Sequence, residues 1–93
     1  MTRMASLLRI FTAELENVYV FGSWKSSRTP GDVDLLLTYR QDRCGIRRAL
    51  VLRNRIEEAV CSEFGLPVHT ILLSLEEEAE VGFIESEGCV SLF

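Results

Sequence analysis

Cysteine, proline and histidine are scarce in this chain of 93 residues, which has 3, 2 and 1 of them. The cysteines, Cys44, Cys61 and Cys89, are odd in number and nowhere as close as Cys-x-x-Cys. This pattern argues against a disulfide framework and against a zinc knuckle. It favours a reducing compartment.

The sequence also lacks a long hydrophobic run. Its most apolar early stretch, Met4 to Phe11, is interrupted by Arg9 and has no small-residue signature of a cleavage site. Neither a signal peptide nor a membrane span is therefore predicted. We expect a cytoplasmic protein.

An excess of basic residues is missing as well. The chain has 10 Lys and Arg against 14 Asp and Glu, a formal net charge of -4. This balance argues against non-specific nucleic-acid binding and against binding to anionic membranes. Arginines do cluster between residues 47 and 55, but three glutamates between 57 and 63 offset them. Nucleotide binding stays compatible with this charge, because a metal ion can supply the positive charge.

What the sequence does have is the composition of one soluble globular domain, which we assign to residues 1–93. Apolar residues at helical intervals predict an amphipathic helix from Met4 to about Asn17 and a second one from Ile46 to Phe64, closed by Gly65 and Pro67. Strands are predicted at residues 18–21, 32–39 and 68–73. Ser74 and Glu77 match a capping box that begins a short acidic helix, and the remaining residues allow a helix extension and a final strand. The predicted fold class is α/β (α+β): a small mixed β-sheet with helices packed on one face.

Two short motifs stand at the ends of neighbouring predicted strands. Gly22-Ser23 follows the first strand, and Asp32-Val33-Asp34 begins the second. Strand side chains alternate, so Asp32 and Asp34 point to one face, roughly 6 to 7 Å apart along the chain. Paired carboxylates are ligands that Mg²⁺ prefers, and two such ions can clamp a phosphoryl transfer. Either motif alone is usually a solvated turn, so the prediction rests on their combination.

The turn between these strands has the groups needed to hold phosphates. Gly22 permits close approach of the backbone, and Ser23 adds a hydroxyl and an N–H. Lys25 and Arg28 are candidates for phosphate contacts, although basic side chains in a polar loop more often only solvate it.

The order of these motifs resembles the DNA polymerase β-like nucleotidyltransferase superfamily, and within it the minimal nucleotidyltransferases. The resemblance is in Val18-Tyr19-Val20-Phe21-Gly22-Ser23, a polar spacer, and Asp32-Val33-Asp34-Leu35-Leu36-Leu37. It implies a nucleotidyltransferase-like fold and transfer of a nucleoside monophosphate from an NTP. It also implies that Gly22 and Ser23 hold the terminal phosphates and that Asp32 and Asp34 hold two Mg²⁺ ions.

The third carboxylate of that family is replaced here. Aligning residues 67–73 with the family's next strand places His69 at its position. Histidine is a poor magnesium ligand but a good proton acceptor near neutral pH. Two hypotheses follow: either His69 is the general base and only the aspartate pair binds metal, or activation of the acceptor is lost.

We therefore expect a Mg²⁺-dependent enzyme that moves NMP, most simply AMP, onto a hydroxyl of a protein or another acceptor. The alternative is a catalytically degenerate module that binds a partner protein, as an antitoxin does, with or without nucleotide. The resemblance implies a helical partner protein, in some cases a toxin that the transferase modifies. Apolar surface at the sheet edge would serve a homodimer equally well.

Overall fold

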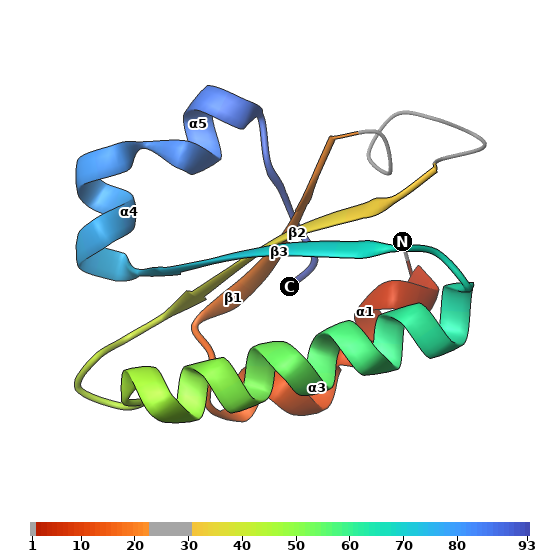
Figure 1. The fold of residues 1–93 in the computed structure, drawn as a ribbon. Helices are drawn as coiled ribbons and strands as arrows, with labels where there is room; N and C mark the ends of the chain where they lie inside the picture. The colour runs from red at the N-terminus through yellow and green to blue at the C-terminus, as the bar shows by residue number, and fades with distance from the viewer. Residues whose placement is uncertain (1, 23–30) are drawn as a thin grey trace.

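A four-stranded mixed sheet forms the centre of the structure, a computed structural model that describes residues 2–22 and 31–93. The strand order is β3-β2-β1-β4 (Figure 1). Strand β1 (Asn17–Phe21) pairs antiparallel with both β2 (Val33–Tyr39) and β4 (Val90–Ser91), and β2 pairs parallel with β3 (Val68–Ser74). The sheet is mixed, as the sequence predicts.

The main helices lie together on one face of this sheet. They are α1 (Thr2–Leu8), the 3-10 helix η1 (Arg9–Ala13) and α3 (Ile46–Phe64), which runs along the same side in Figure 1. The short helices α4 (Leu75–Val81) and α5 (Phe83–Glu87) lie on the other side. There the ring of Phe83 meets Phe21 edge to face, with centroids 5.0 Å apart. The two faces of the sheet therefore have different surroundings.

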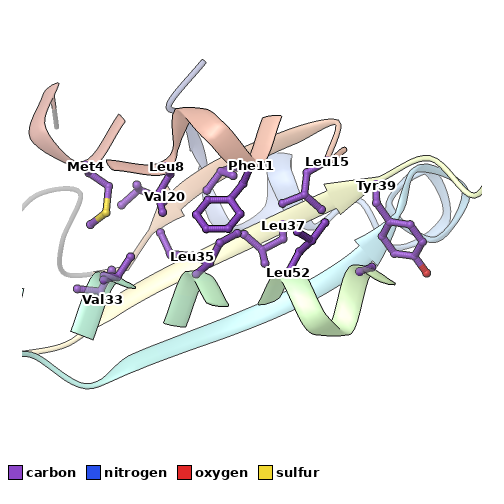
Figure 2. Close-up of a cluster of buried hydrophobic side chains, with 14 of the residues drawn as sticks. Met4, Leu8, Phe11, Leu15, Val20, Val33, Leu35, Leu37, Tyr39 and Leu52 are labelled. Carbon is purple, nitrogen blue, oxygen red and sulfur yellow. The ribbon is translucent and has the colours of Figure 1, made fainter. Parts of the chain in front are cut away.

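The core fills the space between the sheet and the main helices (Figure 2). Successive side chains of a strand point to opposite faces, so every second residue of β1 and β2 enters this core. Its buried strand and helix residues include Val18, Val20, Val33, Leu35, Leu37, Tyr39, Ala49, Leu52, Ile56 and Val60. The residues between them, among them Asp34, belong to the opposite face. Because the core takes one set of alternate residues of β1 and β2, the other set, which includes Asp34, lies on the face opposite the main helices.

The N-terminal segment corrects one expectation. Met4, Leu8, Phe11 and Leu15 all enter the core at helical spacing, as predicted. The α-helix ends at Leu8, however, and continues as the tighter η1 rather than reaching Asn17. The Thr12 hydroxyl donates to the Arg9 carbonyl at 2.6 Å, a local bond of the kind that competes with α-helical pairing.

The remaining elements follow the predicted boundaries closely. Helix α3 ends at Phe64 with Gly65 in the left-handed conformation, φ 67°. The capping box is present: the Ser74 hydroxyl accepts from the Glu77 amide at 3.1 Å, and the Glu77 carboxylate accepts from the Ser74 amide at 2.9 Å. Among residues 2–22 and 31–93, no helix is both long and apolar enough to cross a membrane.

Candidate functional site

The candidate site lies where β1 ends and where β2 and β3 begin. Phe21, the last residue of β1, is the register partner of Asp34, and Asp34 is in turn the register partner of His69. Gly22, Asp34 and His69 therefore come from three adjacent strand ends. Paired residues of neighbouring strands point to the same face, which here is the face opposite the main helices.

Gly22 lies directly against the carboxylate of Asp34. A Cβ added to Gly22 would overlap Asp34 Oδ2 and stand 3.3 Å from Asp34 Cγ. The residue also has φ +71°, in the left-handed region that side chains disfavour. Both the backbone conformation and the contact with Asp34 require glycine at this position.

His69 brings an imidazole to the second aspartate. Its Nε2 lies 3.5 Å from Asp32 Oδ2, and the side chains are 64% and 50% exposed. Such a half-exposed pair is worth little in stability. Its significance is positional, because it places the imidazole beside one of the two aspartates predicted to hold metal, with Nε2 turned toward that carboxylate.

The two carboxylates suit a hard divalent cation better than a soft one. Mg²⁺ is commonly held by one or two carboxylates with substrate phosphates completing the shell. Within residues 2–22 and 31–93, no group of three or more His, Cys, Asp or Glu side chains is arranged to hold a metal ion. Among the described residues, the donor set thus fits a cation that arrives with phosphate ligands rather than a closed protein cage.

Three other predicted site residues lie outside the part of the chain that the structure describes. These are Ser23, Lys25 and Arg28, the proposed phosphate contacts of the turn after Gly22. Their assignment stays a prediction from the sequence.

The site is bordered by an aromatic pair, and the sequence did not indicate this pair. Phe21 precedes Gly22 and is paired with Asp34, and Phe83 packs against it from α5. Because 62 positions separate the two rings along the chain (83 minus 21), no local pattern signals their contact. The pair fixes α5 beside this end of β1 and adds apolar surface next to the carboxylates.

Comparison with known proteins supports the architecture. No family model matches the chain, and no curated protein matches it either. Among solved structures, the chain resembles a crystal structure of a mutant of the toxin–antitoxin pair MntA–HpeT, with a TM-score of 0.61 and 15% identity. The match covers 98% of this chain and 70% of that chain. It bears out the predicted α/β fold, a small mixed sheet with packed helices.

Proposed function

We propose that this chain is a divalent-cation-dependent nucleotidyltransferase that moves NMP, most simply AMP, from an NTP to a hydroxyl of a protein or another acceptor. The observation that carries the proposal is the contact between the Gly22 backbone and the Asp34 carboxylate, with Asp32 and His69 at the same end of the sheet. A backbone without a side chain beside a carboxylate leaves room for a phosphate and its cation.

In this proposal the aspartates hold the cations and the turn holds the phosphates. Asp32 and Asp34 offer oxygen ligands, and bound Mg²⁺ would neutralise the charge that develops on the leaving pyrophosphate. Gly22 and Ser23 would hold the β and γ phosphates, and Lys25 and Arg28 would add positive charge to them. Without a cation these groups would place two carboxylates against a polyphosphate.

His69 has the role of general base. Asp32 faces its Nε2, so the ring is oriented with Nδ1 as the proton acceptor. The acceptor oxygen forms a bond to the α-phosphorus of the NTP, the bond to the bridging oxygen of the β-phosphate breaks, and pyrophosphate leaves. The hydroxyl proton goes to His69.

The structural neighbour adds support of two kinds. Its complex carries two aspartate-to-glutamate substitutions two positions apart, the same spacing that separates Asp32 from Asp34. It is also a toxin–antitoxin pair, which favours a protein acceptor for this chain.

A second candidate function is a partner-binding module without turnover. It is favoured by His69 at the place of a third carboxylate, since two carboxylates make a weaker cation site than three. In this alternative the site holds nucleotide without transferring it, or holds none, and a protein partner binds elsewhere on the fold.

Calorimetric titration with ATP tests the proposal, with Mg²⁺ present or replaced by EDTA. The native chain should bind ATP only with Mg²⁺, and Asp34→Asn should weaken that binding at least tenfold. Asp42→Asn is the matched control, because Asp42 is an exposed carboxylate whose side chain pairs with Arg40. Absence of binding by a folded native chain would contradict the proposal.

Turnover separates the two candidate functions. The test incubates the chain with α-labelled ATP, Mg²⁺ and a protein partner that co-purifies with it. The label should be transferred to that partner, and pyrophosphate should be released. His69→Gln should lower the rate at least tenfold while ATP affinity changes little. Nucleotide binding without transfer to a bound partner would favour the module instead.

A further inference from the structure

Strand β3 is an open edge of the sheet. It is the outermost strand, seven residues long, and pairs only with β2 among the described strands. Its second half is apolar on both faces, with Ile71, Leu72 and Leu73 each only partly buried. A long apolar edge with free backbone groups is a surface that other chains readily extend.

Helix α3 presents apolar side chains beside this edge. The Thr70 hydroxyl of β3 donates to Glu57 Oε2 at 2.6 Å, so the side of α3 that carries Glu57 faces β3. Leu50 lies two turns before Glu57 on this side, and Ile46 lies one turn further. Their exposed fractions are 36% and 53%. The two residues therefore form an apolar strip parallel to the edge strand.

A hollow complements this strip at the other end of the helix. It has a volume of about 490 Å³ and is lined by Glu57, Glu58, Cys61, Ser62 and Val68. The strip belongs to the N-terminal half of α3, and the hollow belongs to its C-terminal half. An antiparallel copy of α3 would place the strip of each helix opposite the hollow of the other.

The two halves of α3 also differ in the charge of an exposed side chain. Its N-terminal half carries Arg47 and its C-terminal half carries Glu58, both exposed. Neither side chain has an ion-pair partner within residues 2–22 and 31–93. Two antiparallel copies of the helix would bring each arginine to the glutamate of the other copy.

We propose that the occupant of this edge is a second copy of the chain, related by a two-fold axis near Leu72. The two β3 strands would pair antiparallel into one continuous sheet, and the two α3 helices would pack antiparallel beneath it. One axis serves both elements, because the Thr70–Glu57 bond sets these two residues at the same level. Strand residues rise about 3.3 Å each and helix residues about 1.5 Å each. Leu72 is therefore level with the part of α3 midway between Arg47 and Glu58. A two-fold contact of this kind is self-complementary and closed.

The candidate site stays accessible in this dimer. Asp34 and His69 belong to the face of the sheet opposite α3, whereas the helix contact forms on the α3 side (Figure 1). The acidic first turn of α4 also lies away from α3, so it does not separate the paired helices. The proposal stands independently of the nucleotidyltransferase function.

Charge exchange between two positions tests the dimer. Analytical ultracentrifugation of the native chain should show a reversible dimer, and Arg47→Glu or Glu58→Arg alone should raise its Kd at least tenfold. An equimolar mixture of these two variants should form a heterodimer, since every Arg–Glu contact is then restored. The double variant should dimerise by itself for the same reason.

Arg55→Glu is the matched control. Arg55 contributes to the lowered pKa of Glu14, which places it on the η1 side of α3, away from β3. It should leave the dimer Kd unchanged. Leu50→Asp should weaken the dimer without loss of helical circular dichroism. A native chain that stays monomeric up to its solubility limit, or a mixture that forms no heterodimer, would overturn the proposal.

Discussion

The backbone of Gly22 rests on the carboxylate of Asp34, across the antiparallel pair formed by β1 and β2. This contact joins the two motifs that the sequence places ten and more residues apart. It sets the carboxylate beside the turn proposed to hold phosphate. The candidate site therefore depends on the absence of a side chain at Gly22 as well as on the carboxylate of Asp34.

Substitution of Gly22 should weaken Mg²⁺-ATP binding by more than its effect on folding stability explains. Gly22→Ala should lower the free energy of unfolding by about 1 kcal/mol through the positive φ, and should also displace the Asp34 carboxylate. Gly65→Ala is the control, because Gly65 has φ +67° and open space around its Cα. Urea unfolding should show similar losses for both variants, whereas calorimetry should show weaker Mg²⁺-ATP binding only for Gly22→Ala. Equal ATP affinities would contradict the assigned role of this contact.

The capping box should stabilise the junction between β3 and α4. Ser74 is fully buried and exchanges two hydrogen bonds with Glu77. Ser74→Ala should cost about 1 kcal/mol of unfolding free energy. Glu77→Gln keeps a side-chain acceptor for the Ser74 amide and should cost much less. Urea unfolding compares the two, and a larger loss for Glu77→Gln would show that charge rather than capping dominates.

The pair Glu14–Arg48 should make stability depend on pH. The hydrogen bond from Arg48, with Nε 2.7 Å from Glu14 Oε2, lowers the pKa of Glu14 below its ordinary value. A carboxyl whose pKa is lower in the folded state stabilises above its unfolded pKa, and the contribution is lost as the pH falls through the folded pKa. Arg48→Gln should therefore be less stable than the native chain at pH 7, with the difference shrinking toward pH 3.

Glu14→Gln provides the control for this pH dependence. It should remove the same contribution as Arg48→Gln, and the double variant should add little further loss at pH 7. Urea unfolding at several pH values measures these differences. A stability difference between native chain and Arg48→Gln that stays constant from pH 7 to pH 3 would exclude the ion pair as its source.

Much of the fold is predictable because local signals decide it. The boundaries of α3 follow from its apolar period together with Gly65 and Pro67, and the start of α4 follows from the capping box. The end of α1 at Leu8 is not predictable in this way, because Met4, Leu8 and Phe11 keep helical spacing through the change to a 3-10 helix. Hydrophobic period alone does not distinguish the two helix types.

The candidate site is predictable in its residue types and less so in its contacts. Alternation along the predicted strand 32–39 places Asp32 and Asp34 on one face, and the resemblance places His69 on the neighbouring strand. The proximity of Asp32 to His69 and of Phe21 to Phe83 depends on pairing between distant segments. Such pairing is set by tertiary structure, so no short window of the sequence contains it.

The central claim is that a cation–nucleotide complex binds at Asp32 and Asp34. The most direct test is the amide NMR spectrum of ¹⁵N-labelled protein with ATP and substoichiometric Mn²⁺, a paramagnetic substitute for Mg²⁺. The account predicts selective broadening of the signals of Gly22, Asp34 and His69, abolished by Asp34→Asn. Broadening centred on the acidic turn of α4, or unchanged in the Asp34→Asn variant, would contradict it.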